Sequence, residues 1–143
     1  YAYSVGGFYV DCGTRPLARL PLTTGPLPGE LYLLRMDTGR IWNGLILAHA
    51  RHPALAKILE QVISNVLNER DHFGRPSNDV LSVTGPVNYQ DLRTPRNRDK
   101  YKVTLFDEDG YLERVQDLKH KRPGWHWQCR QRAESIYETS GAD

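Results

Sequence analysis

The chain has 143 residues, and its 19 Lys and Arg against 17 Asp and Glu give a formal net charge of +2. Hydrophobic residues make up 39% and charged residues 25% of the chain, which is typical of a folded globular domain and excludes a disordered one. The nearly balanced charge argues against a dedicated nucleic-acid-binding protein. No apolar run approaches the roughly 20 residues that span a bilayer.

The first residue and the two cysteines give information on processing, domain number and disulfide or zinc binding. It begins at Tyr1 rather than Met, and no basic segment followed by an apolar run marks a signal peptide. We therefore interpret it as a processed, trimmed or partial sequence in which residues 1–143 form a single domain, and an anchor could lie upstream. Cys12 and Cys129 are too few for a disulfide framework and lack the spacing of a structural zinc site.

The first half of the chain predicts three strands. Residues 5–11 are a turn that runs into a short apolar strand ending at Asp11, and we expect this strand to be buried between neighbours. Residues 23–29 carry two Gly and two Pro and predict a loop. Residues 31–36 and 41–48 are apolar runs separated by a turn at 37–39, which predicts a hairpin.

A helix beginning at Pro53 is the clearest element. Apolar residues follow at steps of three and four, namely Leu55, Ile58, Leu59, Val62, Ile63, Val66 and Leu67. This spacing predicts one apolar stripe that is buried against a sheet or another helix. The polar residues Lys57, Glu60, Gln61 and Asn65 are expected to face water.

The second half predicts shorter elements. The expected order is a loop at 71–78, a short strand at 80–83, a helical turn at 87–92, an exposed loop at 94–100, a strand at 101–106, a turn at 107–110 and a terminal helix at 128–137. Short strands that alternate with helices predict an α/β fold with a mixed sheet and flanking helices.

The glycine-rich start carries the first candidate site. Gly6 and Gly7 allow a sharp turn and close packing, and the strand then brings Asp11 to its carboxyl end. Open α/β sheets bind their ligands at that edge. The carboxylate could hold a divalent cation or a ribose hydroxyl. The alternative is a buried strand whose acid caps the next turn.

Two further segments contain candidate residues. Thr84, Gly85 and Pro86 form a turn whose backbone amides could approach a sugar or phosphate, or an ordinary turn between a strand and a helix. His120 and the aromatic group at 125–127 could bind a diphosphate and stack on a ring, or close the end of a core. The basic residues between 93 and 122 alternate with acids, which favours a solvated face over a binding site.

The motifs together resemble a known family. Residues 6–11 are similar to the segment that leads into the DxD motif of GT-A sugar transferases, and the most similar group is glycosyltransferase family 32, which includes fungal initiating α-1,6-mannosyltransferases. Further segments resemble this family in the same order, namely 15–20, Asn43 with 48–53, 79–86, Asp91 and 120–125. Together they span almost the entire chain.

The resemblance implies the C-terminal part of a GT-A-like domain. It implies transfer of a sugar, mannose above all, with retention from GDP-mannose or a UDP-sugar to a glycan acceptor, with no nucleic acid as partner. Asp11 would be the catalytic acid facing the donor ribose or a Mn²⁺ or Mg²⁺ ion, and His120 would approach the diphosphate and the metal. The substrate-binding residues implied are Gly6, Gly7, Tyr9, Asn43, Thr84, Gly85, His120 and Trp125.

The sequence also departs from this family. Gly13 stands where the second acid of DxD would bind the metal, and the family's upstream nucleotide-binding half is not part of the chain. These departures leave a second interpretation, an inactive sugar- or nucleotide-binding relic of the same fold. Fungal relatives work in the Golgi lumen behind an N-terminal anchor, and bacterial relatives are cytoplasmic. Membrane contact is expected only through such an anchor.

Overall fold

The computed structural model describes residues 1–11, 14–16, 28–107 and 112–114. The strands are β1 (Gly7–Val10), β2 (Thr14–Pro16), β3 (Leu31–Arg35), β4 (Ile41–Ala48), β5 (Val103–Asp107) and β6 (Leu112–Arg114). The helices are α1 (Ala2–Val5), α2 (Pro53–Leu67), α3 (Val80–Val83), the 3₁₀-helix η1 (Pro86–Arg93) and α4 (Pro95–Tyr101). The helix expected at 128–137 and most of the turn expected at 107–110 lie outside the described residues.

The main sheet has the order β1-β4-β3-β5, and β2 and β6 form a separate two-stranded ribbon. β4 is antiparallel to β1 and to β3, whereas β3 and β5 are parallel. The predicted hairpin of residues 31–36 and 41–48 is therefore confirmed. Because β1, β3 and β5 run in the same direction, their carboxyl ends meet at one edge of the sheet.

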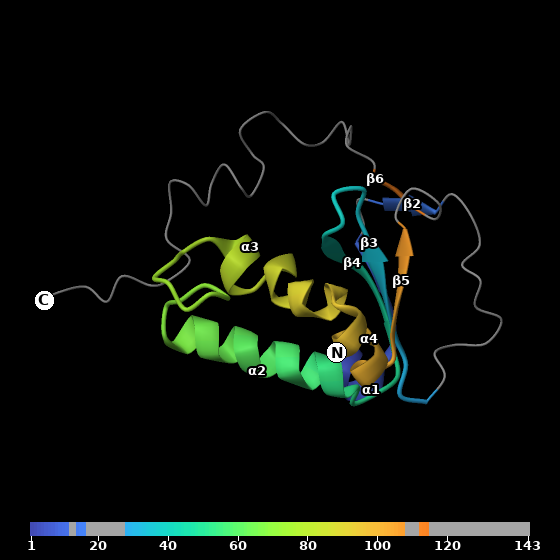
Figure 1. The fold of residues 1–143 in the computed structure, drawn as a ribbon, viewed down its shortest axis with the longest axis horizontal. Helices are drawn as coiled ribbons and strands as arrows, with labels where there is room; N and C mark the ends of the chain where they lie inside the picture. The colour runs from blue at the N-terminus through green and yellow to red at the C-terminus, as the bar shows by residue number, and fades with distance from the viewer. Residues whose placement is uncertain (12–13, 17–27, 108–111, 115–143) are drawn as a thin grey trace, which may run out of the picture.

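Helices cover one face of the sheet and form a mixed α/β structure with it (Figure 1). The core between the layers consists of buried residues from both, namely Leu31, Leu33, Ile41, Ile46, Ala48, Ala54, Leu55, Ile58, Tyr89, Leu92 and Val103. A smaller cluster on the other face contains Leu34 and Leu45, with Trp42 and Phe106 packed against them. Within the described part of the chain, no helix has the length and apolar character needed to cross a membrane.

α2 begins where the sequence predicts, because His52 and Pro53 together suit a helix start. The Nδ1 atom of His52 accepts a hydrogen bond from the Ala54 N–H at 3.2 Å, and its Nε2 lies 3.1 Å from the Gly29 carbonyl oxygen. Proline at the first helical position needs no N–H partner. His52 is buried, so the cap also fixes the loop before β3 to the helix start.

The cap makes stability depend on pH. Burial lowers the pKa of His52 below its ordinary value, against the opposing effect of its hydrogen bonds to the Tyr101 and Gly29 carbonyls. The unfolded chain therefore takes up this proton first, and stability falls as the pH drops below about 6.5. Urea unfolding between acidic and neutral pH measures the slope. His52→Asn keeps a capping oxygen and should flatten the slope. An unaltered slope in His52→Asn would contradict this assignment.

Two short segments differ from the prediction. Residues 80–83 form the helical turn α3 rather than a strand, because the Asp79 carboxylate accepts a hydrogen bond from the Ser82 N–H at 3.1 Å and caps the turn. Residues 94–100 were expected to be a loop, but α4 occupies most of them. Thr94 caps α4 and Pro95 takes its first position, a start signal that the polar composition of the segment concealed.

The expected burial is wrong at two further places. The apolar residues of α2 do not form one buried stripe, because Leu55 and Ile58 are buried whereas Leu59, Ile63, Val66 and Leu67 are exposed. Asn65, expected in water, is buried. β1 was expected to be a buried strand, yet it pairs with β4 alone among the described strands and all its residues are exposed.

Candidate functional site

Asp11 follows β1 directly and so lies at the carboxyl edge of the sheet. Its backbone N–H donates to the Gly44 carbonyl oxygen at 2.8 Å, which continues the pairing of β1 with β4. The Tyr9 hydroxyl donates to the Asp11 carboxylate at 2.6 Å. Because side chains alternate along a strand, Tyr9 and Asp11 lie on the same face as Ile46, the face that carries the helices. The acid is thus held at the backbone and at its carboxylate.

β4 has an irregularity beside this acid. The register with β3 passes from Leu33 opposite Ile46 to Leu34 opposite Trp42, so residues 43–45 have no partner in β3. Bulges of this kind re-aim side chains and are common near functional sites. Asn43 belongs to this bulge and is partly buried. A Cβ at Gly44 would come within 1.9 Å of the Trp42 indole, so only glycine leaves room for that ring.

The Thr84–Pro86 corner joins α3 to η1, not a strand to a helix. A Cβ at Gly85 would lie 2.7 Å from the Leu81 Cα atom, so glycine is required by the close approach of the two helices. The Thr84 hydroxyl donates to the Val80 carbonyl oxygen at 3.3 Å and is exposed. The packing of α3 therefore accounts for the glycine at this corner without a ligand.

A buried amide network holds the corner in place. Asn65 of α2 donates to the Val83 carbonyl oxygen at 2.9 Å and to the Asn88 side-chain oxygen at 3.0 Å. Asn88 donates in turn to the Val83 and Gly85 carbonyl oxygens, both at 3.1 Å. Gln61 completes the set by donating to Asn65 at 2.7 Å. Both asparagines are buried, so the hydrogen bonds replace water that the chain excludes.

η1 connects this corner with the strand ends. The Gln90 side chain accepts from the Ile41 N–H at 3.2 Å and donates to the Ile41 carbonyl oxygen at 3.0 Å, at the start of β4. Burial raises the pKa of Tyr89 to about 12, and the charge of Tyr9 adds to this rise.

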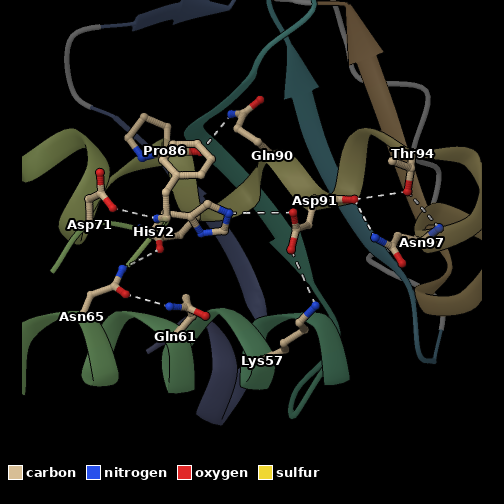
Figure 2. A network of polar contacts seen from close by, with 12 residues as sticks. Lys57, Gln61, Asn65, Asp71, His72, Pro86, Gln90, Asp91, Thr94 and Asn97 are labelled. Carbon is tan, nitrogen blue, oxygen red and sulfur yellow. Dashed lines mark hydrogen bonds and ion pairs between the residues drawn. The ribbon is translucent and has the colours of Figure 1, made fainter. Parts of the chain in front are cut away.

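Asp91 ties η1 to α2 and to the loop after it (Figure 2). Its carboxylate lies 3.6 Å from the Lys57 Nζ atom and 3.8 Å from the His72 Nε2 atom. The Nδ1 atom of His72 is buried and has no hydrogen-bond partner among the described residues. Asp91, which the resemblance includes, therefore bridges elements of the helical layer.

A second pair of charged side chains lies at the same carboxyl edge, on the far side of β4. Arg35 ends β3 and Asp107 ends β5, opposite each other in the parallel register. The Arg35 Nε atom lies 2.7 Å from the Asp107 carboxylate. This hydrogen bond, together with the positive charge of Arg35, lowers the pKa of Asp107.

The structure brings together some of the predicted site residues and separates others. Asp11, Tyr9 and Asn43 lie together where β1 ends and β4 begins its bulge. Gly6 and Gly7 lie at the opposite end of β1, and Gly7 is about 13 Å from Asp11 by the rise of a strand. His120 and Trp125 lie outside the described residues. Within the described ranges, no group of three or more His, Cys, Asp or Glu side chains could hold a metal ion.

The sequence analysis did not identify the polar residues that organise the site. The burial of Asn65 could have been predicted from the sequence. It lies three residues after Val62 and seven after Ile58, on the face that α2 buries. A polar residue at a core position usually has a buried partner. Asn88 and Gln90 had no comparable signal, since an eight-residue 3₁₀ segment shows no clear hydrophobic period.

Comparisons with known proteins do not assign this chain to a family. No protein-family model, no curated protein and no solved structure matches the chain.

Proposed function

We propose that this chain is the C-terminal part of a GT-A-like glycosyltransferase of the family 32 type, which transfers a sugar from a nucleotide-sugar donor to a glycan acceptor with retention. The donor would be GDP-mannose or a UDP-sugar, bound along the carboxyl edge of the sheet. The single observation that carries the proposal is the position of Asp11 at that edge, fixed by Gly44 and Tyr9.

Three features support this assignment. The glycine-containing segment that resembles the family continues into β1 and ends at the acid. The three codirectional strands place their carboxyl ends at one edge, which is where open α/β sheets bind nucleotides. The bulge of β4 contains Asn43 and Gly44, the backbone partner of Asp11, and supplies a polar side chain from a second strand. Asp11 would orient the donor ribose, and Asn43 would contact the sugar.

The side-chain oxygens available at Asp11 do not match the metal ligands of a DxD motif. Mn²⁺ and Mg²⁺ prefer several oxygen ligands, and Gly13 supplies no side-chain oxygen where the family has its second acid. The Asp11 carboxylate is also hydrogen-bonded to Tyr9. We therefore propose that Asp11 contacts the nucleotide-sugar donor directly, without a bridging metal ion.

Asp11→Asn tests the proposal. The amide keeps the shape of the side chain and an acceptor for Tyr9 but loses the charge, so we expect affinity for GDP-mannose or a UDP-sugar to fall at least about tenfold. Isothermal titration calorimetry with GDP-mannose and UDP-glucose measures this change. Asp107→Asn is the matched control at the same edge and should bind as the unmodified chain does. Equal affinity of Asp11→Asn and the unmodified chain would refute the proposal.

Gly13 favours one alternative, a module that binds the donor without turnover. Release of free sugar from the donor separates the two functions, because the enzyme hydrolyses the donor slowly when no acceptor is present. Nucleotide binding without such release favours the module. Gly13→Asp restores the second acid of the motif, and a gain of Mn²⁺ affinity in this variant would support the alignment of the motif.

A further inference from the structure

Arg35 uses only one side of its guanidinium in the contact with Asp107. The Nε atom lies 2.7 Å from the carboxylate, whereas the two terminal Nη atoms make no hydrogen bond to a residue in the described ranges. A guanidinium has five N–H donors in a planar fork, most of them on the Nη atoms. The contact with Asp107 therefore orients Arg35 and leaves its terminal N–H groups for another anion.

Arg35 lies at the carboxyl edge of the sheet and faces the helices. It ends β3 two residues after Leu33, which belongs to the core beneath the helices, so alternation places both side chains on the same face. Asp11 follows β1 on this face as well. Only β4 lies between β1 and β3, so Asp11 and Arg35 are about 10 Å apart across the sheet. An acid and a guanidinium therefore share one edge and one face.

A second arginine reaches the same edge from η1. The Arg93 Nη2 atom lies 3.7 Å from the position that a Cβ would take at Gly39, in the turn between β3 and β4. Gln90 lies three residues earlier on the same side of the 3₁₀-helix, and its bonds to both backbone groups of Ile41 fix η1 there. Ile41 is the β4 residue opposite Arg35. Arg93 makes no ion pair within the described part of the chain, so two guanidiniums flank the start of β4.

The chemistry of the two arginines fits a diphosphate. Arginine binds phosphate oxygens through pairs of parallel N–H groups, which lysine cannot supply. The diphosphate of a nucleotide sugar carries a negative charge on each phosphate, so it matches a pair of guanidiniums. Asp107 is 67% exposed, and solvent screens its charge. Asparagine at this position would keep an oxygen for the Nε bond, so Asp107→Asn leaves Arg35 in place.

We propose that Arg35 and Arg93 bind the diphosphate of the nucleotide-sugar donor and supply the positive charge that a metal ion supplies in a DxD enzyme. The donor would then lie across the start of β4, with Asp11 at its ribose. The identity of the ligand rests on the proposed function, because the two arginines by themselves specify only an anion with phosphate oxygens.

Titration of the full chain with pyrophosphate, followed by ³¹P NMR, measures this binding without a nucleoside. We expect Arg35→Gln to raise the dissociation constant at least about tenfold, because a charge-assisted pair of hydrogen bonds is lost, and Arg93→Gln to raise it as well. Both side chains are exposed, so the unfolding temperature should not change.

Arg40→Gln is the matched control, because it removes the same charge from the turn between β3 and β4. The Arg40 carbonyl oxygen accepts a hydrogen bond from the Met36 N–H at 2.8 Å, which extends the hairpin by one pair. Alternation from Ile41 then directs Arg40 to the face away from the helices. This variant should bind pyrophosphate as the unmodified chain does.

The outcomes separate this inference from the proposed function. If Asp11→Asn weakens donor binding but Arg35→Gln leaves pyrophosphate binding unchanged, the proposed function stands and the inference is wrong. If Arg35→Gln weakens pyrophosphate binding but Asp11→Asn leaves donor affinity unchanged, the anion site stands and its assignment to a nucleotide sugar is overturned. The inference also fails if the chain binds no pyrophosphate, or if Arg35→Gln and Arg40→Gln lose equal affinity, because general charge attraction then accounts for the binding.

Discussion

Asn65→Ala is expected to lower the free energy of unfolding by about 2–4 kcal/mol, because it removes the centre of the buried amide network. The change deletes the hydrogen bonds to the Val83 carbonyl and to Asn88, and it leaves the side-chain oxygen of the buried Asn88 without its donor from α2. A buried polar atom without a partner costs about 1–3 kcal/mol, and the small cavity adds to this. Urea unfolding followed by circular dichroism measures the loss.

Two further variants separate the causes. Asn65→Leu fills the volume but makes no hydrogen bond, so it should still be destabilised if the network rather than packing is responsible. Asn68→Ala removes an exposed asparagine from the end of the same helix and should cost under about 1 kcal/mol. Equal losses in Asn65→Ala and Asn68→Ala would contradict the role of the network.

Asn65→Ala should also affect the candidate site. Asn65 and Asn88 hold the carbonyls of Val83 and Gly85, and these residues bracket the Thr84–Pro86 corner. η1 continues from the corner to Tyr89, whose pKa responds to the charge of Tyr9. If η1 takes part in donor binding, weakening the network should reduce donor affinity even at temperatures where the protein stays folded.

The sequence predicted the elements that have a strong local hydrophobic pattern. The hairpin of β3 and β4 followed from two apolar runs around a turn, and α2 followed from a regular three- and four-residue spacing after His52 and Pro53. In both segments the local pattern and the tertiary packing favour the same structure. The short polar helices α3 and α4 were harder to predict. They depend on the side-chain caps of Asp79 and Thr94 more than on a periodic pattern of hydrophobic residues.

The arrangement of the site was less predictable. The sequence placed Asp11 at the end of a strand, and the structure has it there, next to Gly44. It could not show that β4 bulges at residues 43–45, because a bulge arises from the register of two strands and not from either strand by itself. It also could not show that Gly85 is required by the approach of Leu81, since such a contact depends on how two helices pack.

Gly6→Ala is expected to destabilise the fold by about 2–5 kcal/mol, through strain and overlap together. Gly6 has φ of 73° and ψ of −164°, a conformation open in practice only to glycine. A Cβ there would lie 2.6 Å from the Ala50 backbone nitrogen and 2.8 Å from the Ala48 carbonyl oxygen. Backbone atoms held in β4 and the following turn cannot move aside as a flexible side chain would. Thermal and urea unfolding measure the loss.

Gly7→Ala separates packing from ligand contact within the same motif. Gly7 has φ of 104°, but a Cβ there meets nothing within 4 Å, so we expect only strain of about 1–2 kcal/mol and a folded protein. If the resemblance places a ligand against this segment, Gly7→Ala should weaken donor binding while the protein stays folded. Unchanged donor binding would restrict the double glycine to a structural role. A Gly6→Ala variant as stable as Gly7→Ala would contradict the close approach of Gly6 to the backbone of Ala48 and Ala50.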